Sequence, residues 1–285
     1  MQPETLTPED FGLQQVDNKI LVTPENGNQT PQMIDQTAFY VAAIPAVLIA
    51  GISKGGFGGG IGVMSVPLMV LVIPPTLAAA IMLPILCFMD LFSLWIYRGK
   101  QNSSYLRIMI PAAIVGIVIG ALGFRFLDDG LIRLLVGCIA LWFTASVVIK
   151  ALRPPPTNRA VGSGVGRGLA WSGVAGFTSF MAHAGGPPVQ VYLLRENLDK
   201  TTYQATTVVF FTAVNYIKVI PYGMLGQFQA ESLAVSVTLL PLALVGILLG
   251  AWLHNRVNDR LFFRICYVFL FFTGLKLVGD GLASF

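Results

Sequence analysis

Charged residues are scarce in this chain of 285 residues. Asp, Glu, Lys and Arg make up 11% of it, whereas about a quarter is usual for a soluble domain, and 55% of the residues are hydrophobic. The polar surface that remains is too small for a soluble protein of this length. The sequence therefore predicts an integral membrane protein, and it gives no support to nucleic-acid binding.

Residues that carry enzymatic chemistry are also few. The cysteines Cys87, Cys138 and Cys266 lie within apolar runs without the short spacing of metal ligands, which favours small core residues over a redox role. The only histidines are His183 and His254, and no apolar segment carries paired carboxylates. The glycine-rich SKGGFGGG does not have the order of a nucleotide loop. We expect no enzyme activity, no cofactor and no metal.

Residues 1–36 lack the basic start and apolar core of a signal peptide. They carry six acidic residues and a single lysine, Lys19, among Pro, Asn and Gln. A segment of this composition buries too little apolar surface to form a core. We interpret residues 1–36 as a polar N-terminal tail, disordered or lying on the surface.

Eight apolar runs follow the tail. A helix needs about 20 residues to cross the hydrocarbon of a bilayer. Six runs fit single crossings, at about 76–97, 105–126, 131–150, 202–223, 231–253 and 261–279. The runs 37–73 and 168–195 carry glycine clusters at their centres. This favours, for each, a re-entrant hairpin of two short helices, with the non-helical joint shielded from lipid.

The pattern of the first half recurs in the second. PAAIVGIVIG, which begins at Pro111, returns 130 residues later as PLALVGILLG at Pro241, and Asp90 aligns with Asn215 at an offset of 125. We predict an all-α integral membrane protein with two inverted repeats, each a re-entrant broken-helix hairpin plus three transmembrane helices. The repeats are residues 37–150 and 168–285, joined by a cytoplasmic linker at 151–167.

Lys and Arg residues are unevenly distributed between the two predicted sides. Twelve of the 18 lie in segments that this topology places on the side of the linker, and four lie on the other side. Because cytoplasmic loops collect basic residues, the linker is predicted to be cytoplasmic and both termini to face outward. The remaining two, Lys54 and Lys218, lie inside apolar runs.

The two glycine-rich breaks are candidate anion sites. The first is formed by Gly58, Gly59 and Gly60; the second, by Gly185 and Gly186, precedes two prolines, which suit a first helical turn. The free N–H groups and dipole of a helix start favour an anion. The alternative is that these glycines only let helices pack closely. Because the pattern occurs in both halves, we favour the anion site.

Polar residues near the breaks offer partners for an anion. Lys54 is either a buried counter-charge or an interfacial lysine that reaches water, and His183 is either a donor or titrating group or a histidine bonded to a carbonyl. Asn215 and Lys218 share a helix face, so both reach the cavity, or Lys218 pairs with Asp90 across the halves. The neutral hydrogen-bond donors near the breaks are Ser53, Thr178, Ser179, Gln190 and Gln204. Two tyrosines, Tyr97 and Tyr222, are predicted instead to anchor their helices at the membrane interface.

Residues 38–280 resemble the sulfite exporter TauE/SafE family, also called the toluene sulfonate uptake permeases. The likeness rests on the runs GFGGGIGVMSVPL and GFTSFMAHAGGPPVQVYLL, on Asn215 followed by Lys218, and on a later Gly226. The resemblance implies a secondary carrier of sulfite, sulfonates or sulfoacetate that is coupled to an ion gradient.

We therefore expect a multi-pass carrier of the bacterial cytoplasmic membrane that moves a small anion by alternating access. The predicted substrate-binding residues are Lys54, Gly58, Gly59, Gly60, His183, Gly185, Gly186, Gln190, Asn215 and Lys218. Asp90 and His183 are the candidates for coupling to a proton or sodium ion. An anion channel and a membrane scaffold or assembly factor are the rival functions. Homo-oligomerisation stays open.

Overall fold

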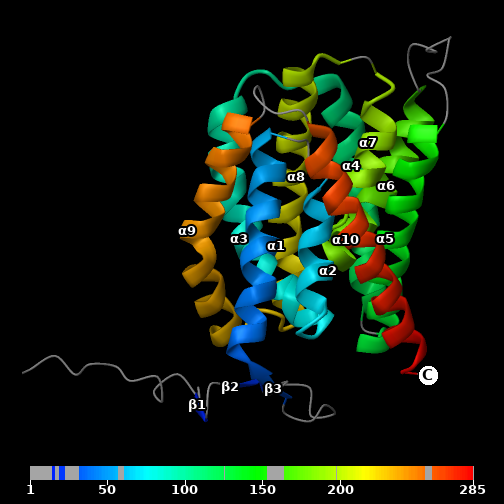
Figure 1. Ribbon diagram of the computed structural model, residues 1–285. Helices are drawn as coiled ribbons and strands as arrows, with labels where there is room; N and C mark the ends of the chain where they lie inside the picture. The colour runs from blue at the N-terminus through cyan, green and yellow to red at the C-terminus, as the bar shows by residue number, and fades with distance from the viewer. Residues whose placement is uncertain are drawn as a thin grey trace, which may run out of the picture.

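The structure is a computed structural model that describes residues 15–16, 19–22, 32–56, 61–124, 126–152, 164–196, 198–253 and 259–284. Its body is a bundle of helices (Figure 1). The helices of the first half are α1 (Gln36–Gly56), η2 (Gly62–Met64), α2 (Ser65–Val70), α3 (Pro75–Tyr97), α4 (Ser103–Phe124) and α5 (Asp129–Leu152). Those of the second half are α6 (Gly164–Ala182), α7 (Gly186–Leu193), α8 (Lys200–Met224), α9 (Ala230–Leu253) and α10 (Asp259–Leu282).

The segment predicted to be a polar tail contains three short strands. They are β1 (Gln15–Val16), β2 (Lys19–Val22) and β3 (Gln32–Asp35), paired antiparallel in the order β1-β2-β3. In the register of β2 and β3, Lys19 lies opposite Asp35 and Val22 opposite Gln32. The polar composition of the whole segment obscured KILV, in which Ile20 and Val22 favour a strand and whose backbone is paired on both sides.

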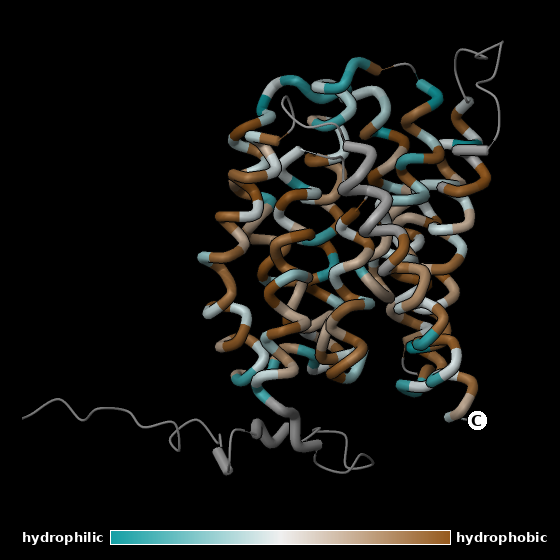
Figure 2. Tube along the Cα trace, viewed as in Figure 1, coloured by the Kyte–Doolittle hydropathy of each residue, from teal (hydrophilic) through white to brown (hydrophobic). Residues whose placement is uncertain are grey.

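The predicted crossings agree with α3, α4, α5, α8, α9 and α10 to within a few residues. Within the described residues, six helices are long and apolar enough to span a membrane: α1, α3, α4, α5 over Asp129–Ser146, α8 and α9. Figure 2 shows hydrophobic residues along these helices and hydrophilic ones gathered toward their ends. Large apolar side chains such as Trp95, Leu122 and Val237 are more than half exposed, which suits contact with lipid.

The two hairpins differ from the prediction of paired short helices. Their first arms, α1 and α6, have 21 and 19 residues, whereas their return arms, α2 and α7, have 6 and 8. Each break lies at the end of its long arm. Helix-compatible residues continue up to Gly56 in α1 and Ala182 in α6, and the glycines and prolines that interrupt the helix come only after them. At the second break His183 takes a positive φ of 51°, and the Ala184 amide bonds to the Thr178 carbonyl at 3.2 Å.

Helices from different halves pack closely through glycine. α1 packs on α9, α4 on α6, and α5 on α10. A Cβ added to Gly51 would lie 2.8 Å from the Gly246 Cα, and one added to Gly176 would lie 2.1 Å from the Ala113 carbonyl oxygen. Only a residue without a side chain permits these approaches.

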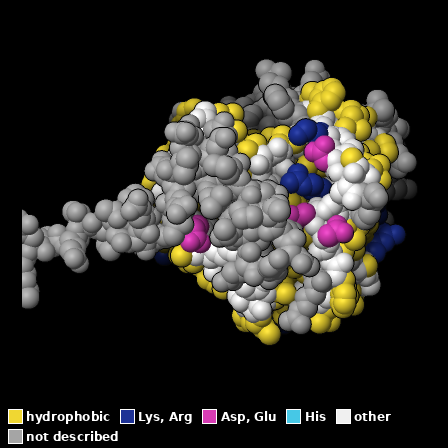
Figure 3. Space-filling model, turned by 90° about the horizontal axis from the view of Figure 1, so that it is seen from below, with side chains coloured by type: hydrophobic (Ala, Val, Ile, Leu, Met, Phe, Trp, Pro, Cys, Tyr) yellow, Lys and Arg dark blue, Asp and Glu magenta, His cyan; other side chains and the backbone are white. Residues whose placement is uncertain are grey.

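Both described ends of the chain lie at one end of the bundle, where the strands and the end of α10 are found (Figure 1). Seen from that end, the described surface carries hydrophobic side chains around its rim, and most of its few charged side chains lie nearer the middle (Figure 3). α5 and α6 extend to Leu152 and from Gly164, so both enter the range predicted to be the linker, of which 153–163 lies outside the described residues.

Asp199 is the exposed N-cap residue of α8. Its carboxylate accepts hydrogen bonds from the Thr201 and Thr202 amides, both at 3.0 Å. These bonds satisfy N–H groups that have no partner within the helix. Hydrogen bonding, chiefly from Thr202, lowers the pKa of Asp199 below its ordinary value.

Candidate functional site

A cavity of about 40 Å³ lies between the two hairpins and the helices α3 and α8. Its lining comes from α1, η2, α2, α3, α6, α7 and α8, so both breaks contribute to one space. The lining residues are Ala50, Ser53, Lys54, Gly62, Ser65, Met82, Leu86, Ser179, His183, Gly186, Phe211 and Asn215.

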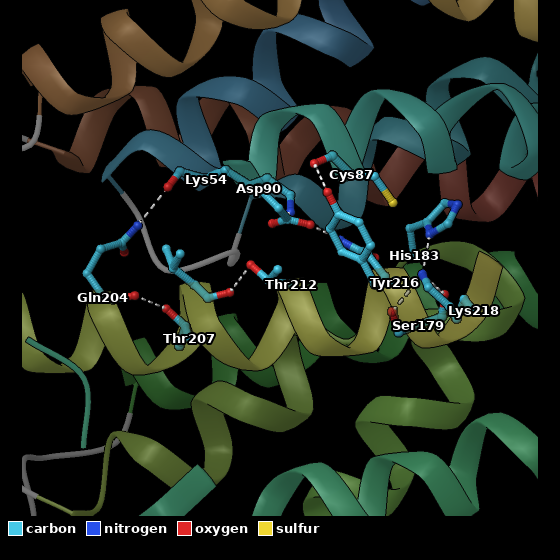
Figure 4. A network of polar contacts seen from close by, with 12 residues as sticks. Lys54, Cys87, Asp90, Ser179, His183, Gln204, Thr207, Thr212, Tyr216 and Lys218 are labelled. Carbon is cyan, nitrogen blue, oxygen red and sulfur yellow. Dashed lines mark hydrogen bonds and ion pairs between the residues drawn. The ribbon is translucent and has the colours of Figure 1, made fainter. Parts of the chain in front are cut away.

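On one side of the cavity, Lys54 of α1 forms an ion pair with Asp90 of α3 (Figure 4). The Lys54 Nζ contacts the Asp90 Oδ1, and the Asn215 Nδ2 of α8 donates to the Asp90 Oδ2 at 2.7 Å. The Asp90 side chain is 1% exposed and that of Lys54 is 12% exposed. Lys54 is therefore the member of the ion pair that lines the cavity, while Asp90 lies behind it.

Lys218 of α8 is fully buried on the side of the second hairpin (Figure 4). Its Nζ donates to the Ser179 carbonyl at 3.0 Å and to the Ser179 Oγ at 3.1 Å, and it lies 2.6 Å from the His183 Nδ1. The His183 Nε2 lies 3.0 Å from the Ala79 carbonyl of α3, to which a proton on Nε2 donates. With this tautomer, neutral His183 accepts from Lys218, and the three N–H donors of the ammonium group have three acceptors.

The predicted alternative of a Lys218–Asp90 pair is therefore wrong. The carboxylate of Asp90 is instead shared by Lys54 and Asn215. Among the described residues at the cavity and those bonded to them, two ammonium groups face one carboxylate. Lys218 therefore has no carboxylate partner among these residues, and burying an ammonium group without one is costly.

Aromatic and amide side chains hold the ends of the long hairpin arms. The Tyr97 hydroxyl donates to the Gly55 carbonyl at 2.7 Å, and the Tyr222 hydroxyl donates to the Phe180 carbonyl at 2.8 Å. The last carbonyls of a helix have no partner within it, so these bonds satisfy them at each break. Both tyrosines are buried, at 6% and 3% exposure, so their predicted role as membrane-interface anchors is wrong.

Neutral polar residues near the breaks divide between backbone support and the cavity. The Gln204 Nε2 donates to the Lys54 carbonyl at 2.8 Å. The Thr178 hydroxyl bonds the Val174 carbonyl of its own helix at 2.9 Å. Ser53 and Ser179 line the cavity, whereas Gln190 lies on α7 outside the lining.

The other predicted site residues are distributed around the same space. Lys54, His183, Gly186 and Asn215 line the cavity, and Lys218 is one hydrogen bond behind the lining. Gly185 is the N-cap residue of α7 and lies outside the lining. A Cβ added there would lie 2.8 Å from the Ala175 carbonyl oxygen, so close packing alone accounts for this glycine. Gly58, Gly59 and Gly60 lie outside the described residues.

Sequence reasoning missed the rest of the lining. Ala50, Met82, Leu86 and Phe211 were not identified because they are apolar residues in apolar helices, with no local mark of a cavity. Ser65 was missed although it stands in the resembling run, GVMSVPL. Its hydroxyl is buried, and it is the least expected polar member of the lining.

Comparison with known proteins identified one family model, described as Sulfite exporter TauE/SafE, which matches residues 43–277. Neither a curated protein nor a solved structure matches the chain. The matched range contains the second hairpin, the first hairpin from residue 43 onward, and the whole cavity lining.

Proposed function

The chain belongs to the sulfite exporter TauE/SafE family, and from this premise we propose that it is a secondary transporter of a small sulfur-containing or organic anion of the sulfite, sulfonate or sulfoacetate type. It works by alternating access in the bacterial cytoplasmic membrane. The anion occupies the cavity between the hairpins.

The observation that carries this proposal is the burial of Lys218 without a carboxylate partner among the described residues. Its Nζ is fully buried and has neutral acceptors only, and all three acceptors belong to Ser179 and His183, which line the cavity. An anion in the cavity would offset the cost of burying the charge. The apolar flanks of the cavity strengthen this attraction, because charges interact more strongly where water is excluded.

Alternating access is supported by the pairing of equivalent elements. The start of α1 and the start of α6 lie at opposite ends of the bundle (Figure 1). Tyr97 bonds Gly55 on α1 as Tyr222 bonds Phe180 on α6, each position shifted by 125 residues. Such a relation is expected of inverted repeats, whose two hairpins exchange roles when the site opens to the other side.

Asp90 gives the empty carrier an internal counter-ion. An anion that binds Lys54 competes with the carboxylate of Asp90, which makes Asp90 a coupling candidate. The second coupling candidate, His183, connects Lys218 to α3 through the Ala79 carbonyl. Coupling through these two groups predicts pH-dependent transport. It is refuted if Asp90→Asn and His183→Gln are both fully active and the wild type is independent of pH.

Counterflow in proteoliposomes tests the proposed function. Vesicles preloaded with unlabelled sulfite should take up labelled sulfite faster than empty ones. A carrier that has released labelled sulfite inside can return to the outside with unlabelled sulfite bound, and this exchange accelerates uptake. Equal rates with and without preloading would instead indicate an anion channel. A scaffold or an assembly factor would be indicated if the vesicles show no anion flux and the variants Lys54→Met and Lys218→Met keep the protein's full function in cells.

A further inference from the structure

We infer that Ser65 is a substrate ligand, and that with Ser53 and Ser179 it forms a three-hydroxyl subsite for a compact oxyanion head with three oxygens on one central atom, as in sulfite or a sulfonate. This inference rests on the proposed function and names the atoms that select its substrate. The hydroxyls come from three elements, α1, α2 and α6, and thus from both hairpins.

The Ser65 hydroxyl is buried and has no hydrogen-bond partner within the described part of the chain. Serine and threonine in membrane helices usually bond a carbonyl three or four residues back. Thr144, Thr207 and Ser236 do so here, at 2.8–2.9 Å. Ser65 makes no such bond and lines the cavity, so a ligand there would satisfy a group that is costly to leave unpaired.

Ser53 and Ser179 each accept one hydrogen bond, and within the described residues neither hydroxyl donates one. The Ser53 Oγ accepts from the Gly62 amide at 3.0 Å, and the Ser179 Oγ accepts from the Lys218 Nζ at 3.1 Å. A hydroxyl group has one donor besides its acceptor positions. Each of these serines can therefore give a proton to an anion, and acceptance from Lys218 increases the polarity of the Ser179 hydroxyl.

The remaining lining limits the substrate class. Ala50, Met82, Leu86 and Phe211 form the apolar lining. The cavity volume is about 40 Å³. These apolar walls offer no hydrogen bonds, so the three hydroxyls suit a compact head that carries the oxygens itself, as in sulfite or methanesulfonate. A halide has no separate oxygens to engage three hydroxyls.

Ser65→Ala tests the assignment, with Ser93→Ala as the matched control. The Ser93 hydroxyl is also buried and without a partner among the described residues, but Ser93 lies on α3 outside the cavity lining. Dissociation constants for sulfite, methanesulfonate and chloride would be measured on purified protein at fixed ionic strength. The melting temperature of each variant without ligand reports whether it is folded.

A hydrogen bond to a charged ligand corresponds to about a ten- to hundredfold change in affinity. We expect Ser65→Ala to weaken sulfite and methanesulfonate binding by this factor, chloride binding by less than about threefold, and its unliganded melting temperature to be unchanged. Ser93→Ala should keep the wild-type affinities. Equal sulfite affinity in Ser65→Ala and Ser93→Ala overturns the subsite, while a wild-type protein that binds no anion overturns the proposed function itself.

Discussion

Replacing Lys218 by Met removes the buried charge while keeping much of the side-chain volume. An anion bonded to the Ser179 hydroxyl would lie within about 3 Å of its oxygen, and that oxygen is 3.1 Å from the Lys218 Nζ. The two charges are then roughly 6 Å apart. At an effective dielectric constant of about 20, their attraction is about 3 kcal/mol, which corresponds to a hundredfold in affinity.

Titration calorimetry with sulfite on the purified protein would measure this loss. Lys276→Met is the matched control, because Lys276 lies on α10 with a side chain that is 57% exposed, beside Asp280 at 3.6 Å. Surface pairs of this kind contribute little, so binding should change by less than about twofold. Raising the salt concentration should weaken the exposed ion pair of Lys276 more than the attraction between Lys218 and a bound anion, because salt screens exposed charges more than buried ones.

The stability of Lys218→Met separates loss of charge from loss of fold. The loss of three hydrogen bonds destabilises the variant, whereas removal of a buried ammonium group without a carboxylate partner stabilises it, so the two effects oppose each other. We therefore expect its melting temperature without ligand to be close to that of the wild type. Wild-type sulfite affinity in Lys218→Met, or an equal loss in Lys276→Met, would refute the charge argument.

Three further predictions concern the frame around the site. Gly176→Ala puts a Cβ 2.1 Å from a backbone oxygen of α4, so we expect at least about 1–3 kcal/mol of destabilisation in denaturant titration; Gly173→Ala, at 3.6 Å, should be tolerated, and equal stabilities would contradict the packing. Tyr222→Phe leaves a buried carbonyl unpaired and should cost about 1–3 kcal/mol of unfolding free energy, whereas Tyr216→Phe removes only a long 3.5 Å contact and should cost less. Asp199→Ala should lower the melting temperature at neutral pH. Because the pKa of Asp199 in the folded state is lowered from 3.8, its contribution to stability is present above that pH and is lost as the pH falls through the folded pKa. A difference in melting temperature from the wild type that persists in acid would argue against the cap.

Local sequence patterns predicted the larger elements. Runs of about 20 apolar residues marked the crossings, since hydrocarbon requires helices of that length, and the glycine-rich interruptions marked the two hairpins. The lengths of the hairpin arms were predicted less well. Helix-compatible residues continue up to Gly56 and Ala182, so each break falls late in its run, and glycine at the centre of a run does not by itself set the end of a helix.

The sequence by itself determined that the chain has helices fit to cross a membrane, and it marked Lys54, His183, Asn215 and Lys218 as the polar residues near the breaks. Tertiary structure alone decided that Asp90 pairs with Lys54 and that Ser65 faces the cavity. The physical reason is one of range. Helix length and breaks depend on neighbours a few residues away, whereas a buried side chain takes its partner from an element 36 to 150 residues distant, chosen by packing.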